Sequence, residues 1–307
     1  MRTADSHRDN TRGILFMLAA STGFIFNDTL VKLANADLAL SQIIVIRGLI
    51  GTPFLILIAG RQGLAELRFA VGERLVWWRT IGEMGSTGLY LTALTRMPLA
   101  NATAILQTLP LVTTVVAALF FAERVGIRRW SAVLIGLGAV VAIIRPGLEG
   151  FNGWSLFALG AVFFIALRDM LSRLIARNIS ALPLTILSSA AVTLLGLAMS
   201  VFEAWRPLTV TAILYVIVAA VLLSVSYLFI VFAMRSGEVS VVSPFRYSIL
   251  LWAIVLQIIV FGVTPDALTL SGSAVLVATG LYTVYRERRV AARAARSPSK
   301  QAFPPPL

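Results

Sequence analysis

The chain has 307 residues, of which 58% are hydrophobic and 13% charged, and its mean hydropathy is +0.89. Soluble domains carry about 25% charged residues, so this composition excludes an ordinary soluble domain. The net charge is +12, and the lack of cysteine excludes disulfides, thiolate nucleophiles and thiolate metal sites.

Apolar runs of about 20 residues recur along the chain, each long enough to cross the ~30 Å hydrocarbon core of a bilayer as a helix. We predict ten spans, at residues 13–33, 39–59, 76–95, 99–121, 128–145, 153–173, 181–202, 209–233, 239–261 and 269–286. The fold class expected is therefore an all-α membrane protein with ten transmembrane helices. Residues 1–12 form the predicted cytoplasmic N-terminus, and residues 287–307, rich in Ala, Arg, Ser and Pro, a disordered basic cytoplasmic tail.

The distribution of basic residues predicts the orientation. If the N-terminus is cytoplasmic, most lysines and arginines fall inside, for example Arg61, Arg124 and Arg288, and few, such as Lys32 and Arg206, fall outside. The positive-inside rule then places both termini in the cytoplasm. Topology accounts for the basic charge, so we expect a lipid bilayer and no nucleic acid as partner.

A short sequence near the start of the chain returns past its middle. Residues 27–33 (NDTLVKL) match residues 168–174 (RDMLSRL) at the acid, both leucines and the base. With five spans in each half, the first and sixth spans enter the membrane from opposite sides. We therefore predict two inverted five-helix repeats, at 13–145 and 153–286, the plan of many secondary transporters.

Ionisable residues inside a bilayer cost several kcal/mol unless they are paired or hydrated, which makes them functional candidates. The candidates singled out within the predicted spans are Asp28, Arg47, Glu83, Arg168, Asp169 and Arg246. Asp28 and Arg47 lie at similar depths, as do Glu83 and Arg246, so we expect each couple to pair. Two interpretations stay open, structural ion pairs between helices and groups that couple transport to an ion.

Polar side chains form stripes on the third, fourth, eighth and ninth spans. Gly82 and Gly85, beside the polar stripe of the third span, would let the backbone of another helix approach closely. Pro110 removes a backbone hydrogen bond in the fourth span and predicts a kink. We predict a shared polar cavity with these candidate substrate-binding residues: Glu83, Thr87, Tyr90, Thr103, Gln107, Ser224, Tyr227, Ser243, Arg246, Tyr247 and Trp252. The alternative is that hydroxyls and prolines only tie the helices together.

Residues 93–144 carry the marks of a known family. Glu123 ends the fourth span, and Trp130 precedes the run LIGLG at 134–138. This segment resembles the end of an EamA domain of the drug/metabolite transporter superfamily, and the resemblance extends to both halves. The second copy departs from the pattern, with Val263 in place of the glutamate and Leu250 in place of the proline.

The resemblance implies a bacterial-type inner-membrane carrier for a small molecule, with a central cavity lined by the third, fourth, eighth and ninth helices. Residues 243–247 (SPFRY) resemble a subgroup that includes carriers for riboflavin and S-adenosylmethionine, which implies uptake of a cofactor-sized solute. Export of amino acids or drug-like compounds and a lipid-linked flippase remain alternatives.

An intramembrane enzyme is the competing class. The single histidine, His7, lies outside the spans, and the sequence has no HExxH motif, no Ser–His pair and no Walker motif. We therefore expect no catalytic residue, no metal and no cofactor. The expected oligomeric state is a monomer or a homodimer. Facilitated exchange stays open, as does proton coupling through Asp28, Glu83 or Asp169, and Arg246 is the expected counter-charge for an anionic substrate group.

Overall fold

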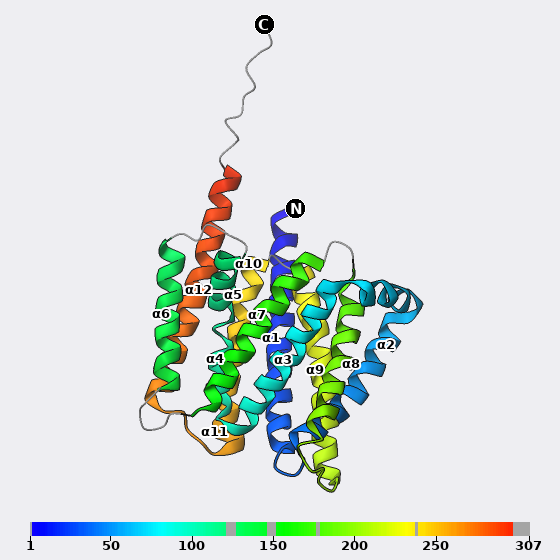
Figure 1. Cartoon of the computed structure of the whole chain (residues 1–307). Coiled ribbons are helices and arrows are strands. Elements are labelled where there is room, and N and C mark those ends of the chain that lie inside the picture. Colours follow the sequence, from blue (N-terminus) through cyan, green and yellow to red (C-terminus); the bar gives the residue numbers. More distant parts are fainter. Residues whose placement is uncertain (1, 121–126, 146–151, 176–178, 237–238, 297–307) are drawn as a thin grey trace.

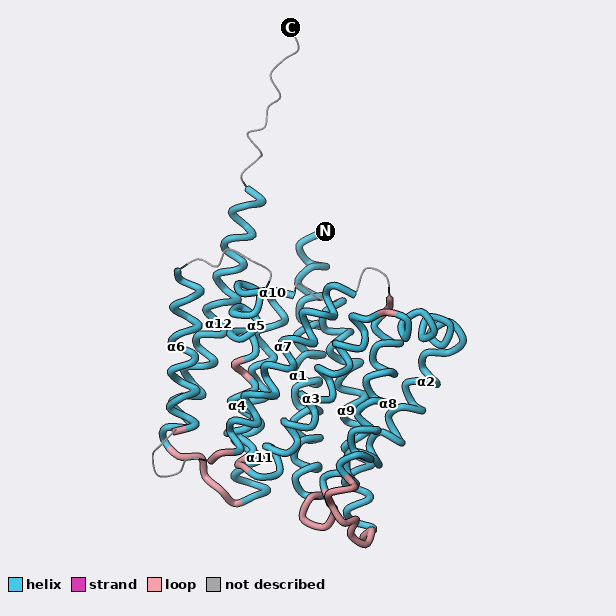
Figure 2. Tube along the Cα trace, in the orientation of Figure 1, coloured by secondary structure: helices cyan, strands magenta, loops and turns pink. Residues whose placement is uncertain are grey.

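The structure, a computed structural model, describes residues 2–120, 127–145, 152–175, 179–236 and 239–296. These residues are almost entirely helical and include no strand, which confirms the all-α expectation (Figures 1 and 2). The helices of the first half are α1 Arg2–Ala34, α2 Leu40–Gly72, α3 Arg74–Arg96, α4 Leu99–Leu106, α5 Leu109–Phe120 and α6 Ile127–Ile144. Those of the second half are α7 Trp154–Ile175, α8 Ala181–Met199, α9 Val210–Ser236, α10 Val239–Val242, the 3-10 helix η1 Ser243–Tyr247, α11 Ser248–Phe261 and α12 Ala267–Arg296.

Many of these helices have the length and composition of membrane spans. Among the described residues, 7 segments qualify: Asn10–Ala34, Leu40–Gly60, Leu99–Val116, Trp154–Ser172, Leu182–Met199, Val210–Ala233 and Ser243–Phe261. Two further apolar segments, Trp130–Ile144 and Ala267–Thr283, are shorter. Helix α3 has 23 residues but is more polar, because it carries charged side chains such as Arg79 and Glu83. The chain is therefore a multi-pass membrane protein, and α1 begins at the same end of the bundle at which α12 ends (Figure 1).

Two apolar segments are interrupted midway. Gln107 and Thr108 form a turn between α4 and α5, because Pro110 cannot donate a backbone hydrogen bond to the Leu106 carbonyl. The predicted kink is thus confirmed as a full break just before the proline. The second break lies in η1, which has Pro244 in its first turn and leads directly into α11.

Two helices run beyond their predicted spans. Helix α2 continues past Gly60, whose φ of 56° interrupts the helical geometry, and its last part turns across the end of the bundle (Figure 1). Helix α12 continues to Arg296, into the segment predicted to be disordered, because Ala and Arg favour helix strongly. Residues 297–307 of that predicted tail lie outside the described residues, as does Glu123 of the family motif.

The helices of the two halves pack chiefly on each other. Helix α1 lies along α9, α3 along α7, α2 along α8 and α6 along α12. Smaller contacts join α2 to α9 and α3 to α8. Helix α1 also contacts η1 and α11, while α7 contacts α4 and α5.

The largest hydrophobic core lies toward the end of the bundle where α1 ends and α2 begins. Leu38, Leu94 and Leu99 are fully buried in this core. Smaller clusters, around Val76 and around Met17, lie toward the opposite end. Packing is therefore most extensive at the end that the basic residues predict to face outward.

Candidate functional site

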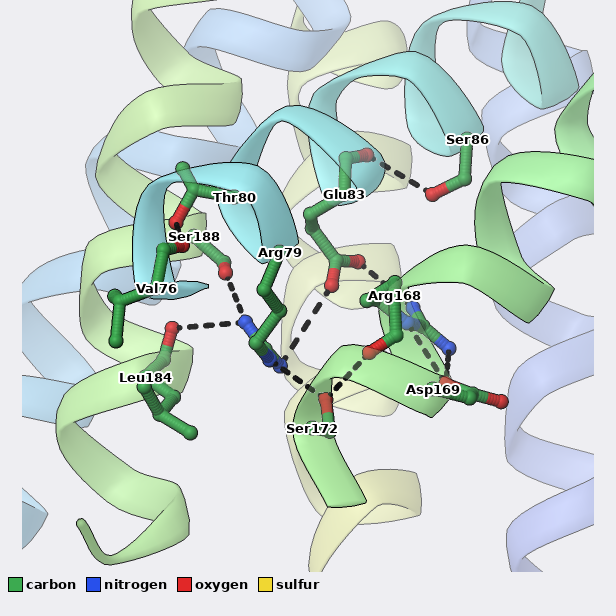
Figure 3. A network of polar contacts seen from close by, with 10 residues as sticks. All are labelled: Val76, Arg79, Thr80, Glu83, Ser86, Arg168, Asp169, Ser172, Leu184 and Ser188. Atoms are coloured by element: carbon green, nitrogen blue, oxygen red, sulfur yellow. Dashed lines mark hydrogen bonds and ion pairs between the residues drawn. The ribbon is translucent and has the colours of Figure 1, made fainter. Parts of the chain in front are cut away.

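A network of charged side chains joins α3 to α7 (Figure 3). Arg168 of α7 lies between two carboxylates, with one terminal nitrogen 3.0 Å from Glu83 Oε1 and the other 2.9 Å from Asp169 Oδ1. Arg79, one turn before Glu83 on α3, lies 3.9 Å from the other Glu83 oxygen. Glu83 is thereby flanked by two guanidinium groups.

Arg79 extends this network to α8. Its Nε donates to the Ser172 hydroxyl at 2.9 Å, and a terminal nitrogen donates to the Ser188 hydroxyl at 2.5 Å and to the Leu184 carbonyl at 3.3 Å. Ser172 in turn donates to the Arg168 carbonyl at 2.7 Å. Side chains of α3, α7 and α8 are thus held in one hydrogen-bonded group (Figure 3).

Glycines on α3 allow this close approach. A Cβ at Gly82 would lie 3.2 Å from the Arg168 Cβ, and one at Gly85 would lie 2.8 Å from the Phe164 ring. The prediction that these glycines receive another backbone is confirmed at Gly82, which meets the backbone of α7, whereas Gly85 receives the Phe164 ring of the same helix. Any larger residue at Gly85 would separate the two helices that carry Glu83 and Arg168.

The predicted pairing of Glu83 with Arg246 is wrong. Glu83 pairs with Arg168, while Arg246 lies exposed on η1. Among the described residues Arg246 makes no ion pair. Depth alone could not choose between the two arginines, because it does not tell which helix faces α3.

A second polar cluster surrounds Asp28 on α1. The Tyr90 hydroxyl of α3 donates to Asp28 Oδ2 at 2.5 Å, and the neighbouring Asn27 amide donates to Oδ1 at 2.9 Å. Thr103 of α4 is buried near the Tyr90 phenol, but its hydroxyl finds no hydrogen-bond partner in the described structure. Asp28, Tyr90 and Thr103 are therefore brought together.

The predicted contact between Asp28 and Arg47 is also wrong. The two side chains attract each other electrostatically, but no ion pair joins them within the described chain. The buried Nε of Arg47 has no hydrogen-bond partner there. Tyr90 has taken the place beside Asp28 that the sequence had suggested for Arg47.

Tyr227 on α9 lies between the two clusters. Its hydroxyl interacts electrostatically with four charged groups, which are Glu83, Arg168, Arg47 and Arg246. The side chain is 46% exposed, although the protein around it desolvates its hydroxyl strongly. Its ring meets Phe24 of α1 edge-on at 5.2 Å. Tyr227 thus places a partly exposed phenol within electrostatic reach of charged groups on α2, α3, α7 and η1.

The other predicted substrate-binding residues fall into two groups. Ser224 donates to the Ala220 carbonyl of its own helix at 2.9 Å, and Tyr247 is buried with its hydroxyl against Gly280 of α12. In the described chain the side chains of three others make no hydrogen bond, and these are Thr87, Gln107 and Ser243. Trp252 is 39% exposed. Sequence reasoning missed Ser172 and Ser188, although Ser172 lies four residues after Arg168 on the same helix face.

Within the described residues, no group of three His, Asp or Glu side chains is placed to hold a metal ion. A comparison with protein families matches residues 11–145 and 152–286, each to the EamA-like transporter family. The chain belongs to this family.

Curated relatives within the family transport different solutes. The chain is 27% identical over 273 residues to a riboflavin transporter of Vibrio cholerae, covering 87% of this chain and 90% of the relative. It is 24% identical over 197 residues to an S-adenosylmethionine uptake transporter of Rickettsia conorii, covering 64% and 66%. It is 27% identical over 276 residues to a pseudopaline exporter of Pseudomonas aeruginosa, covering 86% and 93%. A solved crystal structure with 19% identity matches at a TM-score of 0.55, over 94% of this chain and 99% of the other. That last likeness concerns the fold alone.

Proposed function

We propose that the protein is a secondary transporter that moves a small organic metabolite across the bacterial inner membrane by alternating access. The proposal includes ten transmembrane helices in two inverted repeats, at 13–145 and 153–286, and a central cavity lined by the third, fourth, eighth and ninth helices. In the structure's labels these are α3, α4–α5, α9 and α10–α11. Both termini are proposed to be cytoplasmic, and the protein a monomer or homodimer without catalytic activity.

The helix contacts support a two-fold relation between the halves. If α1 corresponds to α7, α2 to α8 and α3 to α9, the α1–α9 contact maps onto the α3–α7 contact. By the same mapping, the contact of α2 with α9 corresponds to that of α3 with α8. The contacts α2–α8 and α6–α12 map onto themselves. A pseudo-two-fold axis predicts this exchange of neighbours.

Both helix breaks support the cavity. Backbone groups without helical partners are tolerated at membrane depth only where they are buried in protein or line water. The turn at Gln107 and the 3-10 helix η1 occur in corresponding helices, and both lie among side chains with free polar groups. The exposed Tyr227 ring between them supports the same interior space.

The distribution of the core favours an access state closed at the outer end. The largest buried cluster contains Leu38, Leu94 and Leu99, whereas Tyr227 and Arg246 are exposed. Rocking of one repeat against the other would have to break the packing around Leu38, Leu94 and Leu99.

The single observation that carries the substrate proposal is Arg246, an exposed arginine within a predicted membrane span that makes no ion pair in the described chain. An unpaired cation at membrane depth suits an anionic substrate group. Uptake of a cofactor-sized solute such as riboflavin or S-adenosylmethionine is the function proposed, and the carboxylate of S-adenosylmethionine fits Arg246 better than uncharged riboflavin. The pseudopaline exporter relative keeps export of amino acids or drug-like compounds as the second candidate, with a lipid-linked flippase as a third.

A thermal-shift screen of the purified carrier tests this proposal. The ligands are flavins, S-adenosylmethionine, nucleosides and amino acids, applied to wild type, to Arg246→Ala and to Arg68→Ala, whose side chain is exposed on α2. A ligand at 100 times its dissociation constant adds about 2.7 kcal/mol of stability. Stabilisation that is lost in Arg246→Ala and kept in Arg68→Ala supports the site, while equal stabilisation of all three proteins contradicts it.

A further inference from the structure

The described spans contain three carboxylates at membrane depth, Asp28, Glu83 and Asp169, and they differ in whether a cation lies beside them. Glu83 and Asp169 each contact Arg168, at 3.0 and 2.9 Å, so each has a cation directly beside it. Asp28 has no lysine or arginine nitrogen within 4.0 Å in the described structure. Its two hydrogen-bond partners, Tyr90 and Asn27, are both neutral.

We propose that Asp28 is a proton-binding site, and that its proton is the one coupled to transport. The side chain is 8% exposed, and an ionised carboxylate without a partner is costly in such a place. Protonation removes that cost for Asp28, whereas for Glu83 or Asp169 it would leave Arg168 as a buried cation with one partner fewer.

The neighbours of Asp28 serve both of its forms. The Tyr90 hydroxyl donates to the carboxylate, and after rotation its oxygen can accept from the carboxylic acid. The Asn27 amide donates to the carboxylate now, and its buried oxygen is without a partner, so an acceptor is already adjacent. An arginine in either place would favour the ionised form alone.

The charged and titratable groups that act on Asp28 are Tyr90 of α3 and Arg47 of α2. Two other elements packed against α1 carry Tyr227 on α9, and Arg246 and Tyr247 on η1. Lys32, one turn further along α1, is engaged with the carbonyls of Leu94 and Met97 at 2.8 and 2.6 Å. Arg47 is therefore the cation placed to act on Asp28.

This arrangement links proton binding to anion binding. While Arg47 is free, its charge attracts the Asp28 carboxylate and favours loss of the proton. When the substrate anion bound at Arg246 also neutralises Arg47, another arginine within electrostatic reach of Tyr227, that attraction disappears and Asp28 takes up a proton from water. By reciprocity, a proton on Asp28 favours binding of the anion, so the two move together. This coupling step rests on the proposed carrier function, whereas proton binding itself does not.

Infrared difference spectroscopy during a pH titration of the purified full-length protein tests proton binding directly. The carbonyl band of protonated carboxyl groups should grow as the pH falls, and the component from Asp28 should be missing in Asp28→Asn and present in Asp169→Asn, the matched control. Loss of the band in Asp169→Asn instead, or a band unchanged in Asp28→Asn, would overturn the proposal. If Asp28→Asn does not fold, Tyr90→Phe replaces it, and the frequency of the band must then shift because its hydrogen-bond partner is gone; an unshifted band overturns the proposal.

Proteoliposomes test the coupling separately, with S-adenosylmethionine as the probe. An imposed pH gradient should drive accumulation in wild type and Asp169→Asn, while Asp28→Asn should retain only downhill exchange. Gradient-driven accumulation by Asp28→Asn overturns the coupling. Absence of all transport by wild type counts against the proposed substrate, while the infrared result on Asp28 is unaffected.

Discussion

Asp28 and Asp169 stand at the same position of the repeated sequence, yet the structure gives them opposite surroundings. Asp28 is 8% exposed and accepts hydrogen bonds from the neutral groups of Tyr90 and Asn27. Asp169 has a side chain 39% exposed and pairs with Arg168. The difference arises one residue earlier, where the first copy has Asn27 and the second Arg168. This one difference between the two copies leaves Asp28 among neutral groups and makes Asp169 a member of an ion-pair network.

Arg168→Asn breaks this comparison most strongly, because it gives the second copy the residue of the first. Glu83 and Asp169 would both lose their closest cation, and removing one partner of a buried pair costs about 3–5 kcal/mol. We expect a loss near the lower figure, since Arg79 stays beside Glu83. Chemical unfolding in detergent measures the loss, with Arg68→Ala as the exposed control. Equal stability of the two variants would mean that the α3–α7 network contributes nothing.

Gly85→Ala tests the helix contact that brings Arg168 to Glu83. The new Cβ would lie 2.8 Å from the Phe164 ring, and such overpacking costs about 1–3 kcal/mol. Gly138 on α6 has no atom within 4 Å of the corresponding position, so Gly138→Ala should stabilise its helix by about 0.5–1 kcal/mol. Thermal melts of the two alanine variants should therefore move in opposite directions. A shift of the same sign in both would contradict the close approach of α3 and α7.

Tyr90→Phe sharpens the other side of the comparison. It removes the hydroxyl that donates to Asp28, and a hydrogen bond to a charged group contributes about 1.5–3 kcal/mol. We expect about 1.5 kcal/mol near neutral pH and less in acid, where a protonated Asp28 needs that donor less. Unfolding at two pH values measures the change, with the exposed Tyr282→Phe as control. A pH-independent loss would mean that the Tyr90 hydroxyl stabilises the fold through a group other than the Asp28 carboxylate.

Sequence patterns predicted the helices better than their neighbours. Apolar runs predicted an all-helical, membrane-spanning chain, Pro110 predicted the break after Leu106, and Gly82 and Gly85 predicted the close approach on α3, because these are local consequences of chain geometry. The partners of Glu83 and Asp28 were missed for a different reason. Depth along a helix fixes the level of a charge but not which neighbour it faces, and that depends on the packing of both halves together. Tyr90 was named as a cavity residue, yet its bond to Asp28 required knowing that α1 and α3 meet.

The smallest expected effect concerns Asp266, which lies in the loop before α12 and outside the membrane-spanning segments. Partial burial acts to raise the pKa of its carboxyl, but the Thr269 backbone N–H, the Arg145 guanidinium and the Thr269 hydroxyl outweigh this and hold the pKa below its usual value. A carboxyl with a lowered folded-state pKa stabilises the fold above its unfolded pKa of about 3.9, and this contribution is lost as the pH falls through the lower folded value.

The ion pair of Asp266 with Arg145 joins α12 to the end of α6, and the Asp266 side chain is 51% exposed. Because solvent screens such a pair, Asp266→Asn should cost about 0.5 kcal/mol at pH 7. Melting of wild type and variant should differ at pH 7 and converge toward pH 3, since wild type then approaches the uncharged state that the variant always has. The exposed Glu73→Gln, on the opposite side of the bundle, should show no such difference. A gap between wild type and Asp266→Asn that persists unchanged at pH 3 would assign the effect to the hydrogen bonds with Thr269, because an asparagine oxygen replaces the ionised acceptor only in part.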